Sequence, residues 1–248
     1  MKRRMMALAA GLICCITILC AQPKPGTFSI MPKAGVNLTT LTGEPTMMVS
    51  VATFQYSEYY DYGAITPYIS DVSVSTTAFT YHSMRFGWNA GIQLGYQLSN
   101  RWALAGEVQY SLQGAKYDDV SGYGLLYSIN NITLNMHYLN IPLMAKFYPV
   151  RGLAIEAGLQ PEYCFSRKLK CDIEAGTSTI RSKDGVSGMA DFGLSVPVGV
   201  SYEMGNVVVD ARYNIGISNI YSGSWDGGSK PSSRNSVFQL TVGYKFDM

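Results

Sequence analysis

Hydrophobic side chains recur at every second position along eight segments of the chain, and this alternation constrains the fold more than any other feature. In one segment Phe86, Trp88 and Ala90 alternate with small or polar residues. A period of two predicts β-strands with one apolar and one polar face, because an amphipathic helix would repeat about every 3.6 residues. The eight apolar rows run from Phe28 to Leu38, Phe86 to Leu98, Trp102 to Leu112, Leu139 to Phe147, Leu153 to Phe165, Phe192 to Tyr202, Val207 to Ile217 and Phe238 to Phe246.

The opposite faces of these segments carry charged residues, whereas no apolar row contains Asp, Glu, Lys, Arg, His, Asn, Gln, Ser or Thr. A Lys or Arg that faces lipid at the bilayer centre costs roughly 2–4 kcal/mol. Side chains just fill the lumen of an eight-stranded barrel, so we expect inward charges to pair there in a closed network. The predicted network consists of Arg85, Glu107, Lys146, Glu156, Asp191, Glu203, Asp210, Arg212 and Lys245.

The connections between the segments alternate between short and long. The short ones are 99–101, 149–152 and 204–206, and the long ones are 41–83, 115–131, 167–188 and 218–234. Short turns at one end and long loops at the other are typical of bacterial outer-membrane barrels. The sequence therefore predicts an all-β fold, an eight-stranded antiparallel transmembrane β-barrel with long extracellular loops and short periplasmic turns.

A soluble β-sandwich also has alternating strands and is the main alternative to a barrel. A sandwich has no physical reason to separate short and long connections, or to place aromatic residues at both ends of its apolar rows. Both features occur here, and two aromatic girdles are typical of a barrel in a bilayer. The predicted girdle residues are Trp88, Tyr96, Trp102, Tyr110, Phe147, Tyr163, Phe165, Tyr202, Tyr213, Tyr244 and Phe246.

Three prolines and one irregularity interrupt the alternation. Pro142, Pro161 and Pro197 lie inside predicted strands. A residue without an N–H group cannot donate to a β-ladder, so we expect bulges or local breaks at these positions. The alternation also slips near His137 and Tyr138, where a bulge would restore the register.

The first 21 residues have the layout of a secretory signal peptide. Lys2, Arg3 and Arg4 precede an apolar run of helical length, which ends in small residues. We expect residues 1–21 to be removed on export and residues 22–248 to form the barrel domain in the cell outer membrane. The chain has 19 basic and 17 acidic residues. Loss of the three basic residues nearly balances the charge and gives no electrostatic case for a nucleic-acid partner.

Few residues are available for chemistry. Outside the signal segment the cysteines are Cys164 and Cys171, and an oxidising exterior would allow a disulfide if their Cα atoms approach within about 7 Å. The spacing leaves the bridged and the reduced forms open. The histidines are His82 and His137, and they belong to no recognisable catalytic or metal-binding motif. We expect no catalysis, cofactor or metal site, and we keep a rim-located membrane enzyme as the least favoured alternative.

Five segments resemble the PorT-like family of outer-membrane β-barrel proteins. They read Lys-Ala-Gly-Val-Asn-Leu at 33–38, Tyr-Leu-Asn-Ile-Pro-Leu at 138–143, Ala-Gly-Leu-Gln-Pro-Glu-Tyr at 157–163, Asp-Ala-Arg-Tyr-Asn-Ile-Gly-Ile-Ser-Asn-Ile at 210–220 and Gly-Tyr-Lys-Phe at 243–246. The resemblance covers most of the chain after the signal segment, apart from the long connections. It implies an outer-membrane barrel domain and, through the member that gives the family its name, a link to protein secretion.

We expect a structural or interaction role, in which the barrel contacts outer-membrane lipid and presents its long connections to other envelope or extracellular proteins. The alternative is a narrow pore or an accessory component of an outer-membrane transport or secretion system. Connection 41–83 contains β-like runs such as 72–81, which predict an additional hairpin above the membrane. The same connection carries clustered aromatic residues suited to a contact surface, namely Tyr56, Tyr59, Tyr60, Tyr62 and Tyr68.

Overall fold

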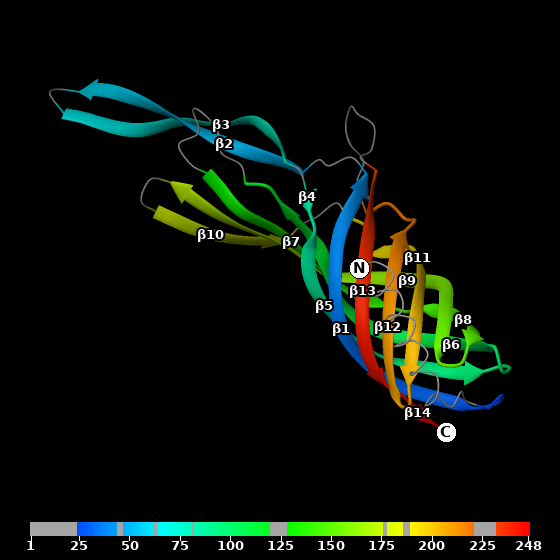
Figure 1. Cartoon of the computed structure of the whole chain (residues 1–248). Helices are drawn as coiled ribbons and strands as arrows, with labels where there is room; N and C mark the ends of the chain where they lie inside the picture. The colour runs from blue at the N-terminus through cyan, green and yellow to red at the C-terminus, as the bar shows by residue number, and fades with distance from the viewer. Residues whose placement is uncertain are drawn as a thin grey trace, which may run out of the picture.

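Eight β-strands form a closed antiparallel ring in the computed structural model, which describes residues 24–43, 47–61, 64–80, 82–119, 128–175, 178–185, 189–220 and 232–248 (Figure 1). In ring order they are β1 (Phe28–Gly43), β5 (Arg85–Gln97), β6 (Trp102–Tyr117), β7 (Ser128–Asn140) continued by β8 (Leu143–Val150), β9 (Leu153–Ala175), β11 (Phe192–Met204), β12 (Val207–Gly216) and β13 (Ser233–Tyr244). Pairing of β13 with β1 closes the ring, with Val36 opposite Leu240. The predicted eight-stranded barrel is confirmed.

Further strands lie outside or extend this ring. They are the hairpin of β2 (Met47–Asp61) and β3 (Ala64–Thr80), β4 (His82–Ser83) beside β6, β10 (Ser178–Gly185) beside β9, and β14 (Phe246–Asp247) beside β1. Figure 1 shows the β2–β3 hairpin and the outer ends of β7, β9 and β10 projecting from one end of the barrel, away from the C-terminus. Among the described residues, no helix has the length and hydrophobicity needed to cross a membrane.

The hairpin predicted within 41–83 is confirmed, but the expectation of loops at 115–131 and 167–188 is partly wrong. Strands β6 and β7 continue into the first of these connections, and β9 and β10 occupy most of the described part of the second. Apolar side chains still alternate in β7 beyond the lipid, but there they face inward, so they do not continue the lipid-facing row from which the membrane strands were predicted.

The ring places apolar side chains on its outside and polar side chains on its axis. Ile92 and Leu94 expose 51% and 58% of their surface, whereas Gln93 between them is 6% exposed. A water-soluble sheet has the opposite arrangement, because burial of apolar surface drives folding in water. An apolar outer wall around a polar interior instead fits a barrel surrounded by lipid.

The prolines lie where the β-ladder is interrupted, as their chemistry requires. Pro142 falls in the gap between β7 and β8, where neither it nor Ile141 belongs to a strand. Pro161 lies across from this gap, and its carbonyl accepts a hydrogen bond from the Ile141 N–H at 2.9 Å. Pro197 pairs with Asn214 on β12, but the ladder between β9 and β11 omits its position.

Replacement of Ile92 by Arg tests which face of the barrel meets lipid. Ile92 lies on the outer face of β5, midway between the girdle residues Trp88 and Tyr96. We expect Ile92→Arg to lower the free energy of unfolding in lipid vesicles by roughly 2–4 kcal/mol, because a cation at the bilayer midplane is poorly solvated. Urea titration followed by tryptophan fluorescence measures this change.

The control for this measurement is Asn100→Arg in the exposed turn that precedes β6. We expect it to change the unfolding free energy by less than about 0.5 kcal/mol, as is usual for surface substitutions. Equal stabilities for the two variants would contradict a lipid-facing outer wall.

Candidate functional site

A cluster of buried ion pairs crosses the lumen. The Arg212 guanidinium of β12 has Nη2 at 2.8 Å from Oδ2 of Asp210 and Nη1 at 3.2 Å from Oε2 of Glu107 on β6. The Lys33 ammonium of β1 lies 2.7 Å from the same Glu107 oxygen and 3.5 Å from Asp210. Two cations therefore share two carboxylates that come from different walls of the barrel.

The same guanidinium connects a further ion pair to this cluster. Lys146 Nζ on β8 lies 3.1 Å from Oε2 of Glu156 on β9, and Arg212 Nη2 lies 3.7 Å from Oε1 of Glu156. Each of the six side chains is at most 4% exposed. An unpaired ion removed from water costs several kcal/mol, so the three cations and three anions are stable together as a neutral unit. We call these six residues the central cluster, Lys33, Glu107, Lys146, Glu156, Asp210 and Arg212.

Strand register positions these side chains, and a glycine makes room for the largest of them. Lys146 and Glu156 lie directly opposite each other on β8 and β9. Glu156 and Arg212 both lie opposite Gly199 of β11. A Cβ atom at Gly199 would approach the Ala211 carbonyl oxygen to 2.6 Å and the Arg212 Cβ to 3.3 Å. The absence of a side chain there lets the guanidinium reach across β11 towards Glu156.

A second charged group lies nearer the short turns. Lys245 Nζ is 2.5 Å from Oε2 of Glu203, and the Tyr148 hydroxyl donates to Oε1 of Glu203 at 2.8 Å. These three side chains and Lys146 line a cavity of about 20 Å³. Such a volume holds about one water molecule, so side chains fill most of the lumen at this level.

Amide and hydroxyl side chains fill the lumen on the long-connection side of the central cluster. Asn37 Nδ2 donates to Ser111 Oγ at 2.9 Å, joining β1 to β6. Gln109 Nε2 donates to Asn89 Oδ1 at 3.1 Å, and Gln239 Nε2 donates to Gln109 Oε1 at 3.2 Å. These side chains are at most 1% exposed, so the hydrogen bonds connect the walls of the barrel directly across its axis.

Beyond this amide layer the polarity of the inner wall reverses. A bulge in β9 marks the level, since Tyr138 pairs with Cys164 and His137 with Ser166, which leaves Phe165 without a partner on β7. The sequence predicted a bulge here, but β7 itself keeps its alternation. The apolar residues of β7 lie on its outer face within the membrane and on its inner face beyond it. Beyond the membrane the inner face is the one shielded from water.

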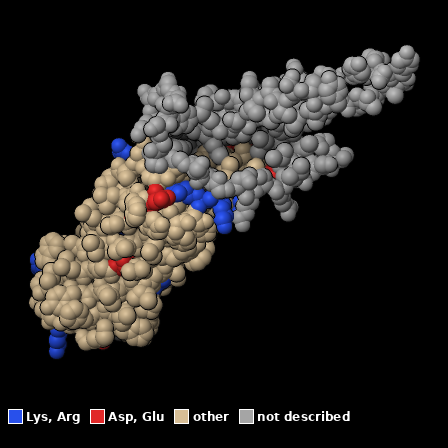
Figure 2. Space-filling model, turned by 180° about the vertical axis from the view of Figure 1, so that it is seen from behind, with Lys and Arg blue, Asp and Glu red and all other residues tan. Residues whose placement is uncertain are grey.

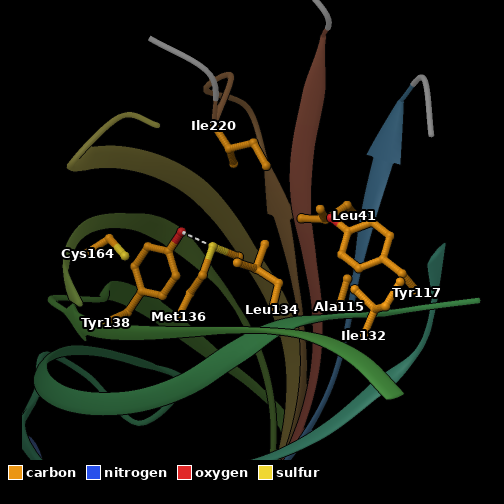
Figure 3. Packing of buried hydrophobic residues seen from close by; sticks show 9 residues of the cluster. All are labelled: Leu41, Ala115, Tyr117, Ile132, Leu134, Met136, Tyr138, Cys164 and Ile220. Carbon is orange, nitrogen blue, oxygen red and sulfur yellow. Dashed lines mark hydrogen bonds between the residues drawn. The ribbon is translucent and has the colours of Figure 1, made fainter. Parts of the chain in front are cut away.

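Apolar side chains therefore close the barrel at its long-connection end (Figure 3). In Figure 3 they converge from β1, β6, β7 and β9 over the barrel axis, and the Tyr138 hydroxyl lies 3.6 Å from the Met136 sulfur. We call this group the apolar cap, Leu41, Ala115, Tyr117, Ile132, Leu134, Met136, Tyr138, Cys164 and Ile220. The cap was not predicted, because a loop was expected at 115–131 and the predicted apolar row of the following strand begins only at Leu139. The apolar residues at 132, 134, 136 and 138 were the available signal.

Two residues predicted for the lumen network, Asp191 and Arg85, belong to neither of the two charged groups. The Asp191 side chain is 60% exposed and pairs with Arg167 at 2.8 Å, so its assignment to the lumen was wrong. The reason is that β11 begins only at Phe192, and Asp191 is the last residue of the preceding connection. Arg85 is half-buried and donates to the Gln113 carbonyl at 3.1 Å and to Asn135 Oδ1 at 2.5 Å.

Lys33 is the member of the central cluster that the predicted network omitted. It lies on the polar face of the first segment, between Gly91 and Gly243 on the neighbouring strands. Its position on that face was the signal for an inward cation. The predicted residues Glu107, Lys146, Glu156, Asp210 and Arg212 are brought together, and Glu203 with Lys245 forms the second group.

The disulfide considered between Cys164 and Cys171 is absent, and neither residue is bridged. Both lie on the continuous strand β9, seven residues apart. An extended chain rises about 3.3 Å per residue, so their Cα atoms are about 23 Å apart. A disulfide needs them within about 7 Å. Cys164 instead packs in the apolar cap, and Cys171 packs against it.

The aromatic residues predicted for the girdles lie on the outer wall of the ring. At the long-connection end Trp88 packs on Tyr110 with ring centroids 4.7 Å apart, and Tyr110 hydroxyl lies 2.7 Å from His137 Nδ1. At the other end Trp102 packs on Phe147 with ring centroids 4.9 Å apart. The remaining predicted girdle residues are also partly or fully exposed, namely Tyr96, Tyr163, Phe165, Tyr202, Tyr213, Tyr244 and Phe246.

Removal of the shared guanidinium tests the central cluster. Arg212→Leu leaves three buried carboxylates with only two cations, and we expect a loss of about 3–5 kcal/mol in the free energy of unfolding. The double variant Arg212→Leu/Asp210→Asn restores the charge balance and should recover part of this loss. Arg167→Ala is the control, because its partner Asp191 is exposed, and it should cost less than about 1 kcal/mol. Equal losses for Arg212→Leu and Arg167→Ala in urea titrations would contradict the cluster's role.

Thiol titration checks the state of the cysteines. We expect two reactive thiols per processed chain after denaturation without reductant. In the folded protein Cys171 should react faster than Cys164, which is 2% exposed, and the single variants Cys164→Ser and Cys171→Ser identify each rate. Fewer than two thiols in the denatured monomer would contradict the unbridged state.

Comparison with known proteins gives the family. The family model described as outer membrane protein beta-barrel domain matches residues 20–222. No curated protein sequence matches the chain. Solved structures similar to it include Ail of Yersinia pestis (13% identity, 90% of this chain, 100% of Ail, TM-score 0.41), OprG of Pseudomonas aeruginosa (13%, 91%, 98%, 0.39) and Neisserial surface protein A (16%, 88%, 97%, 0.37). The family model covers most of the sequence, and the chain therefore belongs to the outer membrane protein beta-barrel domain family.

Proposed function

We propose that this outer-membrane barrel is a closed scaffold that holds an extracellular β-structure for contact with other proteins. The observation that carries this proposal is the filled lumen, in which the central cluster, the amide layer and the apolar cap follow one another along the axis. A barrel whose interior is occupied by its own side chains is suited to anchoring rather than to conduction.

The energetics of the lumen support closure. A hydrated ion on the axis would have to displace the ion pairs of Arg212 and Lys33, which are almost completely buried. Removing one partner of a buried ion pair costs about 3–5 kcal/mol, because the other charge is left unpaired. The ion would then meet the apolar cap, where it has no hydrogen-bonding partners to replace its water.

The projecting strands support an interaction role. The two strands of the β2–β3 hairpin are 15 and 17 residues long. Strand β10 extends the sheet of β7 and β9 beyond the ring. The edge of a β-sheet offers backbone groups on which an extended segment of a partner can add as a further strand. The clustered tyrosines Tyr56, Tyr59, Tyr60, Tyr62 and Tyr68 belong to this connection, but their side chains lie outside the described residues.

A role as an accessory component of a transport or secretion system is the second candidate. The resemblance of five segments to the PorT-like family favours this accessory role. These segments lie in or directly beside strands of the barrel. Such a component would also be a closed barrel that binds other envelope proteins. The two candidates differ in whether the partner belongs to the same envelope or comes from outside the cell.

The rim histidines give little support for the enzyme alternative. His137 contributes to the outer aromatic girdle through its 2.7 Å contact with the Tyr110 hydroxyl. The backbone of His82 pairs with Tyr117 in the short strand β4, and its side chain lies outside the described residues. We therefore propose no catalytic role for either residue.

Planar bilayer recordings test the closed lumen. We expect the processed protein to insert without steady single-channel current, because the central cluster and the apolar cap block the axis. Heat-modifiable migration on gels confirms that the inserted protein is folded. A large and steady conductance from the folded protein would contradict the proposal and favour the pore.

A pull-down from intact outer membrane tests the interaction role. The bait is the full chain, and the comparison variant has Met47–Thr80 replaced by a short Gly-Ser link, which removes the β2–β3 hairpin. We expect the hairpin-dependent partners to be lost while the barrel still folds. Arg167→Ala keeps the hairpin and is the control for non-specific loss. Identical partner sets for the bait and the hairpin variant would contradict a role for this surface.

A further inference from the structure

The outer wall changes from aromatic to cationic just beyond the long-connection girdle. Lys116 on β6 lies opposite Thr133 on β7, and Thr133 lies opposite Lys170 on β9. Lys168 is two residues from Lys170 on the same strand and so points to the same side. All three lysines are exposed. They form a compact group on β6 and β9, the two strands that flank β7, and we call them the lysine group.

The strand pattern fixes the direction in which the lysine group points. Ala115 and Leu134, which lie opposite each other in the next row, face inward and belong to the apolar cap. Side chains alternate between the two faces of a strand, so Lys116 and Thr133 point outward. The lysine group therefore continues the lipid-facing wall that carries Tyr110 and not the wall of the lumen.

The group lies at the level expected for lipid headgroups. Lys168 follows the exposed girdle residue Phe165 by three residues, or about 10 Å along β9. Aromatic girdles mark the boundary of the hydrocarbon core, and the polar headgroups lie directly outside it. Lysines at this height can reach the phosphate layer with their flexible stems.

The three ammonium groups are available for an external anion. Figure 2 shows Lys and Arg side chains gathered on one face, where the barrel body meets the atoms drawn in grey. No carboxylate in the described part of the chain forms an ion pair with the lysine group, whereas the neighbouring Arg167 is already paired with Asp191. The Asp172 carboxylate lies farther from the girdle and accepts a hydrogen bond from Asn131 Nδ2 at 3.0 Å.

The spacing suits a ligand that carries more than one phosphate. Lys168 and Lys170 are about 7 Å apart along β9, and Lys116 and Lys170 are about 10 Å apart across two strand spacings. We propose that Lys116, Lys168 and Lys170 form a binding site for the phosphate groups of outer-leaflet glycolipids. The lipid, rather than a soluble phosphate, is favoured because the site continues directly into the apolar wall, which holds the acyl chains.

Binding of a phosphorylated glycolipid to the folded barrel, residues 22–248, tests this proposal. The probes are lipid A with both phosphates, the same lipid with its phosphates removed, and inorganic phosphate, each titrated in detergent micelles and followed by native mass spectrometry. A lysine near an anionic surface contributes about 1 kcal/mol, or about a fivefold change in affinity. We expect about fivefold weaker binding for each Lys→Gln change and roughly 100-fold weaker binding for all three.

Matched variants separate this site from a general charge effect. Lys24→Gln/Arg101→Gln/Arg151→Gln removes three exposed cations at the short-turn end and should leave binding unchanged. Lys→Arg at all three positions of the lysine group should retain it. Wild-type affinity in the Lys→Gln triple variant, or equal binding of the dephosphorylated lipid, would overturn the proposal. Displacement by inorganic phosphate at equal concentration would also overturn it in favour of a soluble anion. None of these results bears on the closed lumen, which the conductance measurement tests separately.

Discussion

Between the two aromatic girdles the outer wall of this barrel carries no charge, so each ionised side chain at that level has to be placed on the axis and neutralised there. Arg212 is the centre of that arrangement, since its guanidinium contacts carboxylates from β6, β9 and β12. The rest of the lumen follows from it. Lys33 and Lys146 balance the remaining acids, and Gly199 remains without a side chain so that the guanidinium can cross its strand.

Three layers of side chains, each of a different chemical type, follow one another along the axis of the lumen. Ion pairs occupy the level of the hydrocarbon core, amides such as Gln109 and Asn37 follow, and the apolar cap closes the end from which the hairpin projects. The side chains of these layers occupy the axis themselves, so the barrel needs no external ligand to fill it. A filled lumen supports the proposed anchoring role over conduction.

The lipid requirement explains which features could be predicted from the sequence. Within the membrane the outer face must be apolar at every second residue, so strands such as β5 and β6 and the inward position of Glu107 follow from the alternation alone. Beyond the membrane this requirement ends, and residues such as Leu134 and Met136 turn inward instead. These apolar residues also recur at every second position, but they face inward instead of outward. No local sequence signal marks the residue at which the strand leaves the lipid.

The ion-pair partner of each charged side chain was harder to predict than the face of the strand on which that side chain lies. Which inward acid meets which inward cation depends on strand order and register around the closed ring, as in the contact between Arg212 and Glu107, which are 105 residues apart. Asp191 was misplaced because a boundary error of one residue at the start of β11 moves a side chain from the lumen to the rim. The Cys164–Cys171 question was decided by a single fact, namely that both residues lie on one extended strand.

If the apolar outer wall of the barrel touches acyl chains, spin labels on that wall report a hydrocarbon environment. Labels are placed one at a time at Val108, Leu159 and Leu240, which are 56%, 53% and 44% exposed, in a background without Cys164 and Cys171. In lipid vesicles we expect frequent collisions of these labels with oxygen, which concentrates in the hydrocarbon, and few collisions with a water-soluble nickel complex. Frequent collisions with the nickel complex, or protection from both reagents, would contradict it.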